Sequence, residues 1–414
     1  MNPTFSLYTL GCKVNQCDAD ALSAKLKENG YIYTSGKADI YIVNTCTVTQ
    51  NVDKKSQQAI RRARRHNPAA FIAVCGCMEK GGLTSADLTF DTRKPEDLLE
   101  ALEKRFGAER TQEKNESPRK AWGNAGERTR AFLKVQDGCD RYCAYCIVPY
   151  VRGAPVSYPL SGILKQVTSL TEQGIKEIVL AGIQLSSYGN DTGDVYLPAL
   201  IREIAVHAPE LTRLRLSSLD PWAVSDDFLQ AVAQTPALCD HFHLSLQSGC
   251  DATLALMNRR YTAADYGKAV DALRKVRPQA AITTDIIVGF PGESADDFNQ
   301  SLSFAREMGF ARIHVFPYSP RKGTKAAEMP DPIPPAVKKA RNAEMLAAAA
   351  ELKVRFLAAQ AGSTQEVLFE TPTQGHTRNY CMVRTESSSH PNTLANVHIT
   401  GHDNGDGLKG VLAC

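Results

Sequence analysis

Residues 131–146, AFLKVQDGCDRYCAYC, join a strand-like run to three closely spaced cysteines. These are Cys139, Cys143 and Cys146, in a C-x3-C-x2-C pattern. Compact groups of thiolates of this kind bind iron–sulfur clusters or zinc. A structural zinc site usually has a fourth protein ligand, and no further Cys or His follows close by. Three ligands on a four-iron cluster leave one iron open, so the pattern favours a catalytic cluster over zinc or free thiols.

Five more strand-like runs follow this segment. Their starts, counted from residue 131, are roughly 28 to 46 residues apart, which leaves room for one helix between each pair. This alternation predicts a partial β/α barrel of six units, with its chemistry at the carboxyl ends of the strands. The five runs are EIVLAGI (177–183), RLRLSSL (213–219), HFHLSLQSG (241–249), AITTDIIVGF (281–290) and ARIHVFPYS (311–319).

Upstream of the barrel, the chain alternates strands and helices again. This order predicts a βαβαβ domain with a parallel sheet covered by helices. Each predicted strand leads to a cysteine, and these cysteines are Cys12, Cys46 and Cys77. Since ligands of open parallel sheets gather beyond the carboxyl ends of strands, the fold could bring the three thiols together. The predicted strands are FSLYTL (5–10), ADIYIVN (38–44) and AAFIAV (69–74), and the predicted helices span 18–30 and about 51–66.

Other features complete the organisation. Polar residues 111–128 predict a linker between a first domain at 1–110 and the barrel domain at 129–358. An Ala-rich helix is expected from the prolines at 332–335 to about residue 360. Four short β-like runs within 359–414 then predict a small all-β barrel module. The fold class is therefore α/β with an all-β C-terminal module.

Length and composition set outer limits. With 414 residues, the chain is long enough for about three domains, and its ordinary composition excludes fibrous and wholly disordered classes. No run of eighteen apolar residues and no signal-peptide pattern is found, so we expect a cytoplasmic protein without a membrane partner. A net charge of +3 requires any nucleic acid to be held by a local patch. Twelve cysteines in a reducing compartment favour metal or redox chemistry over disulfides.

The string FLKVQDGCDRYCAYCIVPYVRG resembles the methylthiotransferases of the radical S-adenosylmethionine superfamily. The segments LGCKVNQ, VNTCTVT, CGCMEK, LSLQSGCDATLALMNRRYT and TTDIIVGFPGE continue the likeness, and the C-terminal module resembles a TRAM domain. The resemblance covers nearly the whole chain. Within the family, GCKVNQ and VNTCTVT look most like the enzymes that act on N6-threonylcarbamoyladenosine at position 37 of tRNA.

The resemblance implies a radical mechanism with two [4Fe-4S] clusters and S-adenosyl-L-methionine. The cysteines of the barrel motif would hold the cluster that splits S-adenosylmethionine, and the resulting radical would take the hydrogen from adenine C2. Cys12, Cys46 and Cys77 would hold a second cluster, from which sulfur reaches the carbon. Cys75 is a weaker alternative to Cys77, since a strand would point both side chains the same way. A reductant protein such as flavodoxin or ferredoxin would supply the electron.

The resemblance also implies where S-adenosylmethionine and RNA bind. Residues near strand ends would surround S-adenosylmethionine, although barrel packing or helix capping explains them equally well. These residues are Gly182, Gln184, Ser245, Gln247, Arg260 and Asp285. The basic stretch DKKSQQAIRRARRH, residues 53–66, is expected to contact the phosphates of the tRNA anticodon stem-loop, because it follows a cluster cysteine; the alternative is a helix face that is merely solvated. Its expected contacts are Lys54, Lys55, Arg61, Arg62 and Arg65.

The C-terminal module has few features that would let it bind RNA tightly. Lys, Arg, Asp and Glu give residues 361–414 a net charge of −2. Phe369 and Tyr380 are candidates for stacking on RNA, but a core role is the favoured interpretation for both. Two other hypotheses remain open from the residues. The enzyme could act on isopentenyladenosine in tRNA or on a ribosomal protein, or the chain could be a zinc-stabilised RNA-binding protein without catalysis.

Overall fold

The computed structural model describes residues 2–46, 50–77, 86–107 and 129–413. The expected linker at 111–128 lies outside these residues. The chain divides into two units, the first formed by Met1–Ala125 with Cys146–Ala154 and the second by Gly126–Tyr145 with Pro155–Cys414. The barrel and the C-terminal module therefore belong to one unit, and the peptide that begins at the third barrel cysteine packs with the N-terminal unit.

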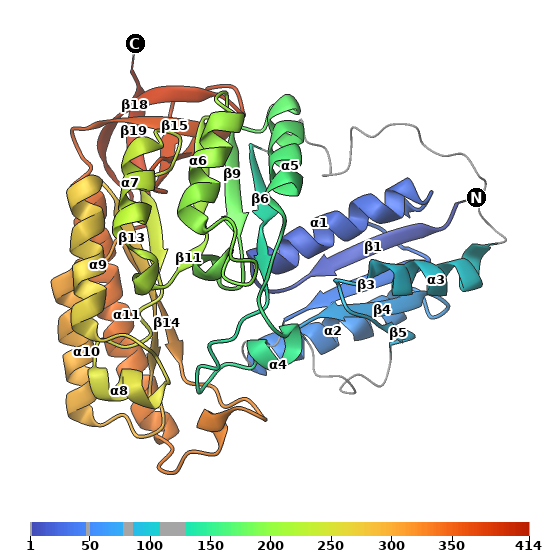
Figure 1. The fold of residues 1–414 in the computed structure, drawn as a ribbon, viewed down its shortest axis with the longest axis horizontal. Coiled ribbons are helices and arrows are strands. Elements are labelled where there is room, and N and C mark those ends of the chain that lie inside the picture. Colours follow the sequence, from blue (N-terminus) through green and yellow to red (C-terminus); the bar gives the residue numbers. More distant parts are fainter. Residues whose placement is uncertain (1, 47–49, 78–85, 108–128, 414) are drawn as a thin grey trace. The chain divides into compact units, whose positions relative to one another are not determined.

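A parallel five-stranded sheet forms the N-terminal unit (Figure 1). Alternate residues of its central strand β3 point to opposite faces: Ile40 and Ile42 pack beneath α1 and α3, and Tyr41 and Val43 pack beneath α2. Both faces are thus covered by helices, as the βαβαβ pattern predicts. The strand order is β2 (Ile32–Tyr33), β1 (Thr4–Thr9), β3 (Ile40–Thr45), β4 (Phe71–Gly76), β5 (Leu88–Thr89), and the helices are α1 (Lys13–Glu28), α2 (Gln50–His66) and α3 (Pro95–Phe106).

The second unit contains the partial barrel, built as two parallel sheets. The predicted run 213–219 is interrupted at Ser217, which divides it into β10 and β11 and thereby separates the two sheets. All six predicted strand regions are present, so the α/β barrel class is confirmed. One sheet has the order β10 (Arg213–Leu216), β9 (Glu177–Ala181), β6 (Arg130–Lys134), and the other β11 (Ser218–Leu219), β12 (His241–Leu244), β13 (Ala281–Val288), β14 (Arg312–Pro317).

Helices cover the outside of these sheets (Figure 1). Two of them begin with capping boxes: Thr262 and Ser294 accept hydrogen bonds from the backbone of Asp265 and Asp297, whose carboxylates bond back. The helices are α5 (Leu160–Glu172), α6 (Leu197–His207), α7 (Asp226–Gln234), α8 (Asp251–Leu256), α9 (Ala263–Val276) and α10 (Ala295–Met308). A short antiparallel pair, β7 (Gln136–Asp137) with β8 (Val156–Ser157), flanks the three barrel cysteines in the chain and was not predicted. Among the described residues, no helix has the length and apolar character that a membrane span needs.

A long helix, α11 (Pro335–Ala358), leads to a closed five-stranded barrel. Four of its strands were predicted, and β16 (Gln374–Thr377) was missed because its sequence, QGHT, contains little that favours a strand. Phe369 is fully buried in the core of this barrel, which agrees with the favoured core interpretation and removes it as a stacking residue for RNA. The other strands are β15 (Thr364–Thr371), β17 (Met382–Thr385), β18 (Leu394–His402) and β19 (Leu408–Leu412).

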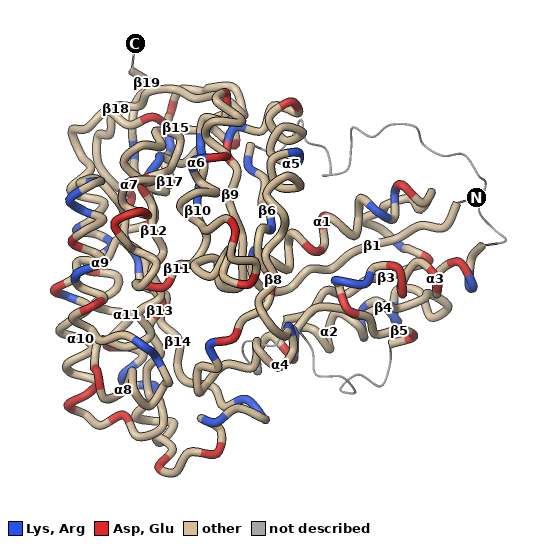
Figure 2. The backbone as a smooth tube through the Cα atoms, in the orientation of Figure 1, with Lys and Arg blue, Asp and Glu red and all other residues tan. Residues whose placement is uncertain are grey.

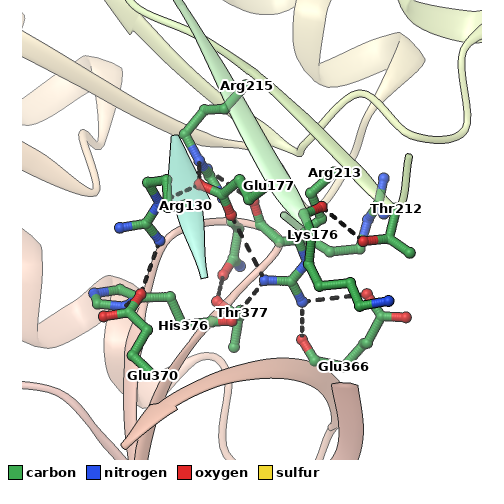
Figure 3. A network of polar contacts seen from close by, with 12 residues as sticks. Arg130, Lys176, Glu177, Thr212, Arg213, Arg215, Glu366, Glu370, His376 and Thr377 are labelled. Atoms are coloured by element: carbon green, nitrogen blue, oxygen red, sulfur yellow. Dashed lines mark hydrogen bonds and ion pairs between the residues drawn. The ribbon is translucent and has the colours of Figure 1, made fainter. Parts of the chain in front are cut away.

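Buried charges join the C-terminal module to the barrel (Figure 3). Arg213 and Arg215 are almost fully buried, as is Glu177, which contacts Arg215 at 2.8 Å and Arg130 at 2.5 Å. Arg213 donates to the carbonyls of His376 and Glu366 in the module. A buried guanidinium is costly unless it is paired and hydrogen-bonded, so these contacts fix the module against the starts of the strands.

The ring of Tyr380 lies among the same cations. The guanidinium carbons of Arg215 and Arg130 are 4.5 and 5.1 Å from its centroid, and the ring of His376 stacks on it at 4.9 Å. The ring of His241, at the start of β12, is 5.0 Å away. Tyr380 is therefore packed against cations and aromatic rings of its own unit, which agrees with the favoured core interpretation and speaks against stacking on RNA.

We expect Glu177→Gln to lower the free energy of unfolding by about 3–5 kcal/mol, because it leaves buried guanidinium groups without their carboxylate. Burial raises the pKa of Glu177, but Arg215 and Arg130 outweigh it and hold the pKa well below its usual range. This stabilisation is complete above the unfolded-state pKa of about 4.3 and is lost as the pH falls toward the folded-state pKa. Urea unfolding at pH 7 and pH 4 measures both effects.

Glu100→Gln is the matched control, because Glu100 pairs with Lys104 on an exposed helix surface. It should leave the unfolding midpoint unchanged. Equal losses for the two variants would contradict the role assigned to the buried network.

Candidate functional site

The first cysteine set lies at one edge of the N-terminal sheet. Cys12 follows β1, Cys46 follows β3 and Cys77 follows β4, and these three strands are neighbours in the sheet. A Cβ placed on Gly11, whose φ is +112°, would lie 3.0 Å from the Cys46 sulfur. Burial raises the pKa of Cys77 to about 11, and the charges of Cys12 and Cys46 act in the same direction. The structure therefore places the three cysteines, which are far apart in the sequence, at the same edge of the sheet.

Two buried asparagines support the loops that carry these thiols. Asn15 donates to the Asn44 side chain at 3.1 Å and to the Thr45 carbonyl at 2.7 Å, and Asn44 donates back to the Asn15 carbonyl at 2.8 Å. Asn15 also accepts the thiol hydrogen of Cys12 at 3.2 Å. These asparagines belong to the segments LGCKVNQ and VNTCTVT, and they explain physically why both segments contain an Asn.

Cys75 does not share this environment. It lies in β4, and its side chain packs in the apolar core with Phe5 and Leu26, where burial raises its pKa well above the usual range. Gly76 has a φ of +97°, and a Cβ there would be 2.3 Å from the Thr45 carbonyl. The chain therefore turns between the two cysteines, and the alternation expected of a continuous strand ends before Cys77.

An arginine that the sequence analysis did not single out completes this set. Arg152, the last residue of α4 (Val148–Arg152), donates through Nε to the Cys77 sulfur at 3.0 Å. Its Nη2 donates to Asn15 at 3.2 Å and to the Asp18 carboxylate at 3.1 Å. Arg152 is the last arginine of the string FLKVQDGCDRYCAYCIVPYVRG. Only the fold shows that it packs with the N-terminal unit.

In the second unit, Cys139 and Cys143 follow the first barrel strand. The Cys139 thiol donates to Gln184 at 3.2 Å, and burial raises the pKa of Cys139 to about 11. Arg259 donates through Nη1 to the Cys143 sulfur at 3.3 Å and is paired through Nη2 with Asp220. Cys146 is the first residue of the segment that packs with the N-terminal unit.

Arg259 replaces Arg260 as the arginine near the cysteines. Arg260 is exposed, whereas Arg259 is buried and its Nε donates to the Tyr261 hydroxyl at 2.9 Å. Tyr261 in turn donates to the carbonyl of Ser245 at 2.7 Å. The double arginine of MNRRY signalled this site, but only the backbone path selects which of the two arginines points inward.

The other residues expected near S-adenosylmethionine lie at strand ends of the barrel. Gln184 is buried, and its backbone N–H donates to the side chain of Gln136 at 2.8 Å. Gly182 is closely packed: a Cβ there would be 3.0 Å from the Gln136 side chain and 3.1 Å from the Leu185 backbone, so these neighbours would have to shift. These contacts hold the end of β9 close to the segment that leads to Cys139.

Gln247 and Asp285 connect two neighbouring barrel strands. Gln247 has a φ of +69°, which is strained for this residue type, and its N–H donates to the carbonyl of Asp285 at 2.8 Å. The Asp285 carboxylate is 3.3 Å from His243. Ser245 is half-buried beside them. A strained residue at a strand end is typical of ligand sites, and these side chains remain candidates for S-adenosylmethionine contact.

The donor sets of both sites fit an iron–sulfur cluster. Each offers cysteine sulfurs with an arginine directed at one of them, and such hydrogen bonds stabilise the charge of thiolate-bound iron. Within 2–46, 50–77, 86–107 and 129–413, no three His, Cys, Asp or Glu side chains are gathered as a single metal ion would require.

Comparison with known proteins identifies the families that this chain resembles. Residues 133–305 match the Radical SAM superfamily, and residues 4–88 match the Uncharacterized protein family UPF0004. The chain is 33% identical to the threonylcarbamoyladenosine tRNA methylthiotransferase MtaB of Bacillus subtilis, over 92% of this chain and 90% of that protein. It is 38% identical to MtaB of Aquifex aeolicus, over 80% and 84%.

A relative with a different named product matches almost as well. The tRNA-2-methylthio-N(6)-dimethylallyladenosine synthase of Endomicrobium trichonymphae is 34% identical, over 88% of both chains. Among solved structures, the radical S-adenosylmethionine methyltransferase TsrM of Kitasatospora setae has a TM-score of 0.55 at 14% identity, over 79% of this chain and 77% of that one. That likeness concerns the fold alone.

We expect Arg259→Ala to reduce reductive cleavage of S-adenosylmethionine by about 10–100-fold, because it removes the cation beside Cys143. Arg260→Ala is the matched control and should keep wild-type cleavage. The measurement is the 5′-deoxyadenosine formed per reconstituted cluster after reduction with dithionite. A larger loss in the Arg260 variant would contradict the assignment, because Arg260 and not Arg259 would then be the arginine that supports cleavage.

Proposed function

Because this chain belongs to the radical S-adenosylmethionine tRNA methylthiotransferase family, we propose that it methylthiolates adenine C2 of N6-threonylcarbamoyladenosine at position 37 of tRNA. The observation that carries the proposal is the gathering of Cys12, Cys46 and Cys77 at one sheet edge, in addition to the barrel motif. We assign a [4Fe-4S] cluster to the barrel cysteines and a second one to this N-terminal set.

The reaction needs a radical, because an adenine C2–H is neither acidic nor electrophilic. When bound, the barrel cluster and S-adenosylmethionine supply that radical chemistry. The protein's own residues position these groups: Gln184 contacts Cys139, Arg259 contacts Cys143, and Asp220 holds Arg259 in place. The remaining proposed contacts to S-adenosylmethionine are Gly182, Ser245, Gln247 and Asp285.

The substrate assignment rests on two supports. The segments GCKVNQ and VNTCTVT resemble enzymes that act on threonylcarbamoyladenosine, and the two MtaB relatives carry that nucleoside in their names. The alternative is dimethylallyladenosine, which the name of the Endomicrobium relative supports. Both substrates share the reacting carbon and differ in the group on N6.

Helix α2 is the proposed contact for the tRNA backbone. Its Ile60 and Ala63 pack in the core of the N-terminal unit, while the five expected contact residues Lys54, Lys55, Arg61, Arg62 and Arg65 are exposed. Arg64, by contrast, pairs with Asp87 at 2.8 Å. Other exposed helices differ: α9 and α10 carry residues of both signs (Figure 2). Among the described residues, these five cations of α2 have no ion-pair partner, and such a helix suits phosphate binding better than a mixed surface does.

The C-terminal module offers fewer cations for RNA. Arg378 pairs with Asp240, and Arg384 and Lys409 both pair with Asp403. These are all the Lys and Arg residues in 361–414. We therefore propose that the N-terminal unit contributes more phosphate contacts than the module does.

Two partners complete the proposal. A one-electron donor such as flavodoxin or ferredoxin would reduce the barrel cluster, since the protein side chains cannot supply the electron. The tRNA substrate places the reaction in the cytoplasm. Because the target base must leave the anticodon loop to reach the site, we expect a single-stranded loop to be engaged.

Expression of the wild type in a strain lacking the enzyme should restore 2-methylthio-N6-threonylcarbamoyladenosine. Cys143→Ala should abolish both this product and cleavage of S-adenosylmethionine, because the electron enters through that cluster. Cys46→Ala should keep cleavage and lose the product, because sulfur would come from the other cluster. Nucleoside mass spectrometry and 5′-deoxyadenosine assays measure the two outcomes.

Control and contradictory outcomes are distinct. Cys75→Ser should retain the product, because Cys75 lies in the core instead of the site. Restoration of the dimethylallyl product alone would change the substrate, and no change in any tRNA nucleoside would point to a protein substrate. Equal product from Cys46→Ala and wild type would remove the role of the N-terminal set.

Replacing Arg61, Arg62 and Arg65 together with Gln should weaken tRNA binding about 10-fold at moderate salt and make its salt dependence shallower, because phosphate contacts are lost. The matched control replaces Lys268, Lys275 and Arg306 on α9 and α10, which are exposed as well. Filter binding across a salt series gives the comparison. An equal loss in both triple variants would indicate a general charge effect instead of a site on α2.

A further inference from the structure

We propose that Arg152 is the positioning residue of the N-terminal cysteine set, holding Cys77 in place and supplying the positive charge that favours one-electron reduction of the cluster there. This inference rests on the second cluster of the proposed function. The inference goes beyond that function because it gives Arg152, which lies just after the barrel motif, a role at the cluster of the N-terminal cysteines. All the contacts of Arg152 described below lie inside the N-terminal unit.

The first step is geometric. The Nε of Arg152 is 3.0 Å from the Cys77 sulfur, and Nη2 is 3.1 Å from Asp18 and 3.2 Å from Asn15. The side chains of Arg152 and Asp18 are 6% and 1% exposed. A planar guanidinium with several partners keeps one orientation, so the N–H that reaches the sulfur is fixed.

The positive charge of Arg152 would act on the reduction potential of the cluster. Three thiolates give a [4Fe-4S] cluster a net negative charge, and reduction adds one more. Arg152 is always protonated, and hydrogen bonds and nearby positive charge raise the reduction potential of such clusters. Asp18 opposes this effect, because its carboxylate partly neutralises the same guanidinium. The pair therefore sets the potential through two groups of opposite sign.

The third step explains how Arg152 reaches this place. Helix α4 begins two residues after Cys146 and ends at Arg152, whose carbonyl accepts a hydrogen bond from Arg93 at 2.9 Å. Arg93 is itself held by Asp91 at 2.7 Å. With a rise of about 1.5 Å per residue, α4 spans only about 6 Å. The N-terminal unit therefore holds both the side chain and the backbone of Arg152. Arg152 is only six residues after Cys146, a proposed ligand of the barrel cluster.

The experiment uses the full-length protein with Cys139, Cys143 and Cys146 replaced by Ala, so that only the N-terminal set can hold a cluster. After anaerobic reconstitution, iron content and the midpoint potential of the reduced-cluster signal in electron paramagnetic resonance are measured. Arg152→Gln should reduce the equilibrium constant for reduction about tenfold, a shift of about 59 mV to more negative potential for one electron. Asp18→Asn should shift the potential in the opposite direction.

Two further variants separate charge from folding. Arg93→Gln loosens the same helix end without touching a sulfur and should keep the parent potential. Arg152→Lys keeps the charge and should lie closer to the parent than Arg152→Gln does. If Arg152→Gln loses its iron while Arg93→Gln retains it, the positioning role is supported, and the Lys and Asp18 variants then report the potential.

The outcomes distinguish this inference from the proposed function. A parent protein that binds no iron would overturn the second cluster itself. A parent that binds four irons, with an unchanged potential and iron content in Arg152→Gln, would overturn only the role of Arg152. Shifts of the same sign in Arg152→Gln and Asp18→Asn would also overturn it, because loss of order would then replace charge as the cause.

Discussion

A buried thiolate is unstable unless a positive group or a metal stands beside it, and both cysteine sets of this chain provide the positive group in the same way. Each places a buried arginine against one cysteine sulfur and a carboxylate behind the arginine. Each also has a side-chain amide against a second cysteine. The matching groups are Asp18, Arg152, Cys77, Asn15 and Cys12 in one unit, and Asp220, Arg259, Cys143, Gln184 and Cys139 in the other.

Parallel strands make this arrangement possible. In a parallel sheet the carboxyl ends of adjacent strands share one edge, so residues far apart in sequence become neighbours there. Cys12, Cys46 and Cys77 use this property directly. The barrel gathers polar groups across its two sheets: Gln184 and Asp220 follow β9 and β11, which belong to different sheets, and meet at 3.3 Å. The two units have different sheets and share this method of assembling polar groups.

The strand ends and the cysteines could be predicted from the sequence, because hydrophobic runs and alternation specify them locally. The supporting residues could not. Arg152 reaches Cys77 only after the chain has crossed 75 positions, and no local pattern marks that contact. Arg259 and Arg260 are adjacent and chemically identical, so the choice between them depends on the turn after α8. Likewise, the turn at Gly76 decides between Cys75 and Cys77, and a rule of strand alternation cannot anticipate it.

The buried network around Glu177 has a consequence for how this protein can be divided in the laboratory and in evolution. The carbonyls of Glu366 and His376 are acceptors for Arg213, which is completely buried. A fragment ending after α11 would expose that guanidinium. It would also lack the Tyr380 ring, against which Arg130 and Arg215 pack. The C-terminal barrel is thus a structural part of its unit and cannot be exchanged by itself. Gene fusions or domain swaps that replace it must keep these arginines and their acceptors together.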